Sequence, residues 1–189
     1  MNESQRDHID GILAQWRRER PDLDTAPMGL IGRLFRAEHF ADAALAEGLA
    51  EHHLQAGWFD LLAALRRAGS PYELNPTQLM YSTMLSSGGM TKRLDRLEGA
   101  GLVERRPDPS DRRGTLIRLT RQGRTTIDQA VNAHVANEER LLSSLTLAQK
   151  RTLDGLLRTL LASLEEWDGG PDNSPRRRRF SGMAPTARP

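Results

Sequence analysis

The stretch Ser86–Arg124, SSGGMTKRLDRLEGAGLVERRPDPSDRRGTLIRLTRQGR, decides the fold of this chain. It holds ten Lys or Arg against five Asp or Glu, a local net charge of +5, whereas the whole 189-residue chain carries only +2. The pattern predicts a short helix, a tight stop, a strand, a charged loop and a second strand. Basic charge gathered in one compact unit is typical of a nucleic-acid reader.

A helix-turn-helix is predicted from Asn75 to Gly99. Asn75 and Pro76 begin a helix that runs over 77–85, and Ser86 or Ser87 caps a second helix that ends at Gly99. Small and hydroxyl-bearing residues in its first turn, followed by two cations, allow close approach to phosphates and base edges. With the two arginines of the loop that follows, the residues predicted to contact DNA are Ser86, Ser87, Gly88, Thr91, Lys92, Arg96, Arg112 and Arg113.

Two strands, 102–106 and 115–120, are predicted to form a wing beside this pair of helices. The eight-residue connection over 107–114 carries Arg112 and Arg113 at its apex, which suits contact with the minor groove or the backbone of DNA. Asp111 is a poor choice for a purely electrostatic finger. We expect it to pair with an arginine and so hold the shape of the tip.

The remaining chain is predicted to be helical, over 5–18, 27–50, 54–68 and 121–144, with a last helix after a capping box at Thr146–Gln149. The fold class is therefore mainly α with a small β-wing, a winged helix-turn-helix. The last helix has a leucine stripe stronger than one small domain needs, and we expect it to pack against a second copy. The stripe comprises Leu153, Leu156, Leu157, Leu160, Leu161, Leu164 and Trp167.

Two polar residues stand opposite the apolar face of the helix over 54–68. Asp60 and Arg67 are seven residues, or about 10.5 Å, apart on one side. Spacing alone favours a solvated polar face. Arg93 lies at the boundary of the apolar stripe in the second helix of the helix-turn-helix. Its guanidinium either turns inward to meet a carboxylate or extends outward over its packed stem.

The chain from about 28 to 167 resembles the MarR family of transcriptional regulators. The order of elements matches, and the string Asp108–Gly114, DPSDRRG, followed by LTRQGR up to Arg124, is similar to the wing signature of that family. The resemblance implies a homodimer whose terminal helices interlock. It also implies recognition helices that enter adjacent major grooves of a near-palindromic operator.

A narrower resemblance is to the urate-responsive branch of that family, the group of HucR, PecS and MftR. The strings that carry it are WRRERPDLDTAPM, FDLLAALRRAG and SSGGMTKRLDRLE. It implies a ligand pocket formed by Trp16, Asp60, Arg67 and Arg93, although a tryptophan on an apolar stripe is more often simple core packing. The hypothesis is a repressor that releases DNA when urate or a similar small anion binds. The alternatives are a different phenolic or anionic effector, or an architectural DNA-binding protein without a ligand.

Other classes of function find little support in the residues. The chain has no cysteine, and it lacks the motifs of phosphate-binding loops, zinc proteases and serine hydrolases, so we expect no enzyme and no cofactor. Adjacent His52 and His53 point to different sides of a helix, which disfavours a metal site there. No apolar run is long enough to span a membrane and no secretory signal is visible, so we expect a cytoplasmic protein.

Four segments follow from these patterns. Residues 1–53 hold an extra helix and a dimerisation helix, 54–124 the DNA-reading unit, and 125–167 the closing dimerisation helices. Residues 168–189, which include the arginine run 176–179, are predicted to be a disordered basic tail that is solvated or adds nonspecific attraction to DNA.

Overall fold

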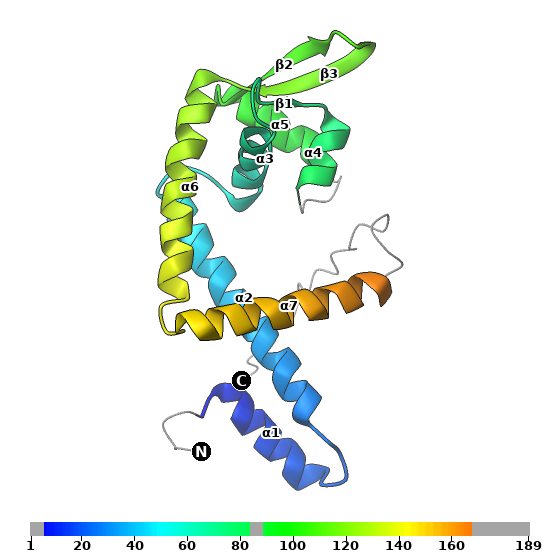
Figure 1. Ribbon diagram of the computed structural model, residues 1–189, viewed down its shortest axis with the longest axis vertical. Helices are drawn as coiled ribbons and strands as arrows, with labels where there is room; N and C mark the ends of the chain where they lie inside the picture. Colours follow the sequence, from blue (N-terminus) through cyan, green and yellow to red (C-terminus); the bar gives the residue numbers. More distant parts are fainter. Residues whose placement is uncertain (1–5, 84–88, 168–189) are drawn as a thin grey trace, which may run out of the picture.

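The computed structural model describes residues 6–83 and 89–167, so the predicted tail lies outside the described residues. Within these ranges the chain forms seven helices and a small three-stranded sheet, arranged as a winged-helix lobe with long helices running away from it (Figure 1). The elements in chain order are α1 (His8–Glu19), α2 (Ala26–Ala50), α3 (Ala56–Arg67), β1 (Glu73–Leu74), α4 (Pro76–Ser82), α5 (Met90–Gly99), β2 (Val103–Asp108), β3 (Asp111–Leu119), α6 (Arg121–Leu141) and α7 (Leu147–Trp167). The predicted fold class is confirmed.

Helix α1 begins later than predicted because Asp7 caps it. The carboxylate of Asp7 accepts from the N–H of Asp10, and the Asp10 side chain accepts in turn from the N–H of Asp7. This capping box satisfies two N–H groups that the first turn leaves unpaired. Arg33 of α2 donates to both carboxylates at 2.7 Å, which ties α1 to α2.

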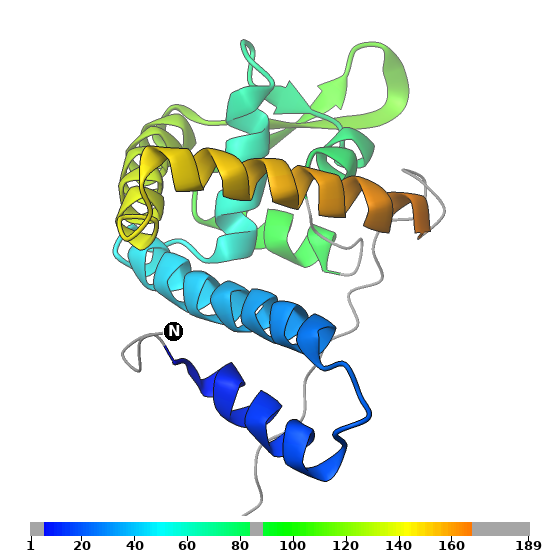
Figure 2. The same cartoon turned by 60° about the horizontal axis from the view of Figure 1, so that its bottom comes forward.

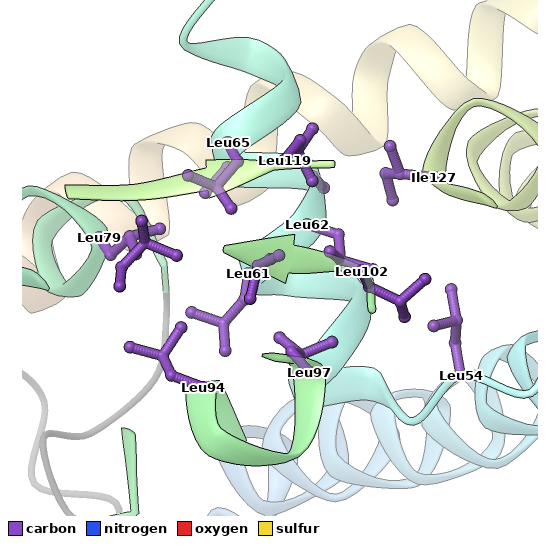
Figure 3. Close-up of a cluster of buried hydrophobic side chains, with 14 of the residues drawn as sticks. Leu54, Leu61, Leu62, Leu65, Leu79, Leu94, Leu97, Leu102, Leu119 and Ile127 are labelled. Carbon is purple, nitrogen blue, oxygen red and sulfur yellow. The ribbon is translucent and has the colours of Figure 1, made fainter. Parts of the chain in front are cut away.

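The core of the lobe surrounds α3 (Figure 3). Leucines of α3 meet leucines of α4 and α5, strand residues of the sheet and the first turns of α6, and many are completely buried. Leu54, predicted to lie on α3, instead precedes the helix and is still buried at 3% exposure as a member of the core cluster. The largest fully buried side chains are Leu61, Leu62, Leu65, Leu79, Leu97, Ile117 and Ile127.

The second helix of the helix-turn-helix begins at Met90, which makes the predicted cap at Ser86 or Ser87 wrong. Gly89 occupies the N-cap position with φ 92°, a conformation that glycine adopts without steric cost. Ser86, Ser87 and Gly88 themselves lie outside the described residues. The first helix is capped as predicted, by a capping box between Asn75 and Gln78.

The sheet has the order β1-β3-β2 and is antiparallel throughout. Its wing is longer than predicted, because residues assigned to an eight-residue loop continue the two strands and leave only 109–110 between them. Asp108 closes this turn by accepting from the N–H and the hydroxyl of Ser110 at 2.8 and 2.6 Å. Pro107 is tolerated because β2 is an edge strand.

Helix α6 connects the wing to the terminal helices. The hydroxyl of Thr120 caps it by accepting from the N–H of Gly123, and further along Asn137 donates to the carbonyl of Ala44 in α2 at 2.9 Å. Helix α7 then leaves the end of α6 as an arm (Figures 1 and 2). Its predicted capping box, Thr146 with Gln149, is present.

Candidate DNA-reading and ligand-sensing surfaces

Helix α5 packs one stripe into the core and turns the opposite side to solvent. Met90, Leu94 and Leu97 are buried at 5%, 3% and 0% exposure. Thr91, Lys92 and Arg96, three of the residues predicted to contact DNA, are exposed. The helix therefore presents hydroxyl and cationic groups to solvent.

The tip of the wing is held by its own acids. The carboxylate of Asp111 accepts from the backbone N–H of Arg113 at 2.9 Å. Asp111 therefore contacts an arginine, as predicted, and does so through the backbone of that residue. Hydrogen bonds from Ser110 hold the pKa of the Asp108 carboxyl below its ordinary value. The side chain of Arg113 is exposed, and the backbone of Arg112 belongs to β3. Contact of these arginines with DNA stays a prediction.

Sequence reasoning missed the role of Arg105, which it counted only as part of the basic charge. The guanidinium of Arg105 donates to Asp95 of α5 at 2.6 Å and also to Glu98, and its backbone N–H donates to Glu98 at 3.1 Å. The hydrogen bond to Asp95, with the two nearby carboxylates, raises the pKa of Arg105. One indication of this contact is present in the sequence: Asp95 and Glu98 are two acids, three residues apart, on a helix that otherwise has the residues expected for DNA binding.

Arg93 leaves α5 on the other flank and lies against α3. A Cβ at Gly57 would be 2.9 Å from its Nε, and one at Gly89 would be 3.2 Å from its Nη1, so the guanidinium occupies the space that these glycines leave open. Asp60 follows Gly57 by three residues and therefore lies on the same side of α3, where it is half-buried. Of the two orientations left open by the sequence, Arg93 takes the inward one.

The other two predicted ligand residues lie at different places. Arg67 ends α3, is exposed, and donates to the carbonyl of Ser82 at 3.0 Å, which links α3 to the end of α4. Trp16 is 38% exposed on α1, and α1 packs on the half of α2 that is remote from the lobe (Figure 1). The single chain therefore brings Arg93 to the Asp60 side of α3 and leaves Trp16 apart from them.

A cavity of about 550 Å³ lies between α3 and α6. Phe59, Ala63 and Val131 form its apolar part, and Arg66, Arg67, Asp128 and Asn132 its polar part. Arg67 is the member of the predicted ligand set that lines it. The other polar residues of the cavity were not predicted as site residues. Arg66 and Asp128, for example, are 62 positions apart in the chain, and no sequence pattern links residues at that separation.

Two residues that line this cavity, Arg66 and Asp128, form an ion pair. Arg66 Nε lies 2.6 Å from Asp128 Oδ1, which raises the pKa of Arg66. Arg66 and Arg124 also lie over the ring of Tyr72, at 5.1 and 4.7 Å from its centroid. Tyr72 directly precedes β1, so this cluster joins α3, α6 and the base of the wing.

The described residues, 6–83 and 89–167, form neither a metal site nor a membrane-spanning helix. No group of three or more His, Cys, Asp or Glu side chains is arranged to hold a metal ion within those ranges. The ring of His134 lies 4.5 Å from that of Phe59, centroid to centroid, and its Nε2 lies 3.3 Å from Glu138 Oε1. No helix in the described part of the chain is long and apolar enough to cross a membrane.

A helix-turn-helix with a β-wing and an exposed cationic helix defines the class of winged-helix DNA-binding proteins. Residues 53–114 match the model of the MarR family. The chain is 43% identical over 149 residues to the HTH-type transcriptional regulator PecS of Dickeya dadantii, covering 79% of this chain and 90% of that protein. It is 33% identical over 135 residues to the multiple antibiotic resistance protein MarR of Escherichia coli, covering 69% and 90%.

Solved structures agree with these relatives. A mutant of E. coli MarR complexed with operator DNA has a TM-score of 0.62 and 29% identity, covering 77% of this chain and 97% of that one. The chain belongs to the MarR family. It is accordingly a DNA-binding transcriptional regulator and not an enzyme, and the predicted resemblance to the group that contains PecS is matched by the 43% identity.

Proposed function

We propose that this regulator is a cytoplasmic repressor that binds a near-palindromic operator as a homodimer and releases it when urate or a similar small anion binds. The observation that carries the proposal is the position of Arg93. It belongs to the recognition helix, yet its guanidinium lies against Gly57 of α3, on the side that holds Asp60. A ligand that engages this side of α3 would act directly on the helix that reads DNA.

DNA reading is assigned to residues 54–124. Thr91, Lys92 and Arg96 of α5 would enter the major groove together with Ser86, Ser87 and Gly88 before the helix, while Arg112 and Arg113 contact the backbone or the minor groove. The exposure of Thr91, Lys92, Arg96 and Arg113 supports this assignment. So does the complex of E. coli MarR with operator DNA, whose fold this chain shares.

Dimerisation is assigned to residues 1–53 and 125–167. Six leucines of α7 stand exposed in the single chain, from 37% for Leu160 to 66% for Leu147, as does Leu30 of α2 at 73%. Apolar surface of this extent needs a partner. A two-fold dimer would also place two recognition helices on two half-sites of an operator.

The ligand set suits a planar anion with several N–H and carbonyl groups. The guanidinium groups of Arg67 and Arg93 offer forked donors to carbonyl or anionic oxygens, and the carboxylate of Asp60 accepts from ring N–H groups. The indole of Trp16 would stack on the ligand, with the dimer as the assembly that brings an α1 to the pocket. Binding would draw Arg93 away from its place on α3 and shift the population of α5 positions away from the one that fits DNA.

A mobility-shift assay on the promoter region beside the gene for this protein tests the ligand. Urate at millimolar concentration should release the unmodified protein and leave Arg93→Ala bound. Asp60→Asn, which keeps size and removes charge, should need more urate for release. If urate diminishes DNA binding by neither the unmodified protein nor Arg93→Ala, the assignment of the ligand is wrong and the assignment of DNA binding stands.

A second assay tests the DNA contacts independently of the ligand. Arg112→Ala and Arg113→Ala should each weaken binding to the same fragment and lower the slope of log affinity against log salt by about 1 per lost phosphate contact. Glu104→Gln, a change of charge at the base of the wing, serves as the control. Full affinity in the double arginine variant would mean that the wing does not touch DNA.

A different effector is the second candidate, and the cavity between α3 and α6 favours it. Its volume of about 550 Å³ is ordinary for a small-molecule site, and it combines the apolar Phe59 and Val131 with the cationic Arg66 and Arg67. A phenolic carboxylate such as salicylate would fit that chemistry. If salicylate releases DNA from the unmodified protein and from Arg93→Ala but not from Arg66→Ala, the effector binds in this cavity. Indifference to both compounds would favour an architectural protein.

A further inference from the structure

Arg105 joins the two parts of the DNA-reading surface, the recognition helix and the wing. Its guanidinium contacts Asp95 at 2.6 Å and Glu98, and its N–H donates to Glu98 at 3.1 Å. We call these three residues the Arg105 bridge. Each end of the bridge belongs to a different reading element, since Arg105 lies on β2 and the two acids lie on α5.

The place of β2 in the sheet makes this contact important for the wing. In the order β1-β3-β2, strand β2 has β3 on one side only. An edge strand leaves alternate N–H groups without a partner in the ladder, and Glu98 accepts the one of Arg105. The bridge therefore supports the wing from the side that the sheet leaves open.

The bridge also balances α5. Arg93 and Glu98 are five residues apart, which places them about 140° from each other around the helix, on opposite flanks of the buried stripe. Arg93 lies against α3, and Glu98 and Asp95 hold β2. The recognition helix is thus fixed to the body of the lobe on one flank and to the wing on the other.

Charge gives a second reason for an arginine at this position. Asp95 and Glu98 have side chains 57% and 38% exposed, next to a surface that meets phosphates. Two free carboxylates there would repel DNA. A planar guanidinium engages both at once through separate N–H groups, which a lysine ammonium on a flexible stem does poorly.

We propose that Arg105 is a positioning residue that fixes the wing relative to α5, so that the recognition helix and the wing tip act as one rigid reading unit. The consequence for DNA rests on the wing contact proposed above. The claim that Arg105 fixes the wing relative to α5 is independent of that contact, because it concerns the free protein and can be measured without DNA.

The chain has no cysteine, which allows the geometry to be measured with two spin labels. Thr91→Cys on α5 and Ser110→Cys at the wing tip receive the labels, and labelled chain is diluted with unlabelled chain so that pairs within one chain dominate. A narrow distance distribution is expected in this background. Arg105→Ala should at least double its width, and Arg106→Ala, which removes the same charge one residue along β2, should leave it unchanged.

Glu98→Gln with Asp95→Asn approaches the same bridge from the helix and should broaden the distribution as well, with the guanidinium intact. This pair keeps the test valid if Arg105→Ala is poorly folded. An unchanged width in both variants would overturn the proposal, because the sheet alone would then hold the wing.

Affinity gives the functional half of the test. The probe is a duplex that the unmodified protein selects from a random-sequence pool. Arg105→Ala should weaken binding to this duplex about tenfold, an effect of the size found for residues that share one interaction network. Arg106→Ala should weaken it less. In the Arg105→Ala background, Arg113→Ala should cost much less than in the unmodified protein, whereas Lys92→Ala should cost the same. A broadened distance distribution together with full affinity for DNA would overturn the role of the bridge in DNA binding. Only the claim that the bridge positions the wing would then stand.

Discussion

The winged-helix lobe and the terminal helices differ in how they use apolar side chains. In the lobe, Leu61, Leu65, Leu97 and Ile117 are at most 1% exposed and contact one another across helices and sheet. In the terminal helices, Leu30 and Leu156 are 73% and 65% exposed although they belong to regular apolar stripes. One region satisfies its apolar surface within the chain, and the other does not.

This difference indicates what each region needs in order to be stable. The lobe buries its stripes on itself, so its stability should depend on internal packing. The terminal helices should depend on a second chain, because burial of such leucines contributes roughly 1.5–3 kcal/mol each only when something covers them. Four changes distinguish these dependences, from the largest expected effect to the smallest.

The largest effect is expected at the junction of wing and α6. A Cβ at Gly123 would lie 1.9 Å from the carbonyl oxygen of Leu102, a backbone atom that has no room to move. Gly123→Ala should therefore cost more than about 4 kcal/mol of folding free energy, measured by urea unfolding. Gly155→Ala in α7 is the matched control, since nothing lies within 4 Å of its Cβ. It should be neutral or stabilising by about 0.5–1 kcal/mol.

The core of the lobe comes next. Leu61→Ala removes a side chain that is 0% exposed, so it should cost about 3 kcal/mol by lost burial and the cavity left behind. The cost should be the same at every protein concentration at which the oligomeric state is constant. A loss below about 1 kcal/mol would mean that the centre of the lobe relaxes around the gap.

A smaller effect with a different signature is expected on α7. Leu156→Ala should leave the urea unfolding of the lobe unchanged and weaken association of two chains by on the order of 1–2 kcal/mol, seen by sedimentation over a concentration series. Glu165→Ala, on the same helix and outside the stripe, is the control. Equal association of the Leu156 variant and the unmodified chain would remove α7 from the interface.

The smallest effect is expected where α1 meets α2. Arg33 holds the pKa of Asp7 below its ordinary value of 3.8. A lowered folded-state pKa contributes stability above the unfolded value, which is lost as the pH falls through the folded one. Asp7→Asn keeps an N-cap and removes the charge. Its thermal midpoint should be slightly lower than that of the unmodified chain at neutral pH and the same well below pH 3.8.

The regular elements of the lobe follow from the sequence because local signals agree with burial. Asn75 with Pro76 begins α4, and Thr146 with Gln149 begins α7, as the capping patterns predict. The start of α5 was predicted too early because serine is the commoner cap, whereas Gly89 takes a left-handed conformation that composition does not reveal. The wing was predicted too short because Asp108 and Asp111 close a tight turn with side-chain hydrogen bonds.

The candidate site was predictable only in part, for reasons of distance along the chain. Periodicity placed Asp60 and Arg67 away from the core and Arg93 at a boundary, and the structure adds the direction that Arg93 takes. Periodicity carries no information on pairs such as Arg66 with Asp128 or Arg105 with Asp95, which depend on how separate elements pack. It also could not place Trp16, since the position of α1 depends on what the terminal helices pack against.

The edge strand β2 has a consequence for the protein in concentrated solution. An open strand edge is a template on which another chain can add a strand, the first step of fibrous aggregation. Here that edge carries Glu104, Arg105, Arg106 and Pro107, all exposed. Charge repels an incoming strand, and proline offers it no N–H. The wing can thus remain open to solvent without seeding fibrils from its own free edge.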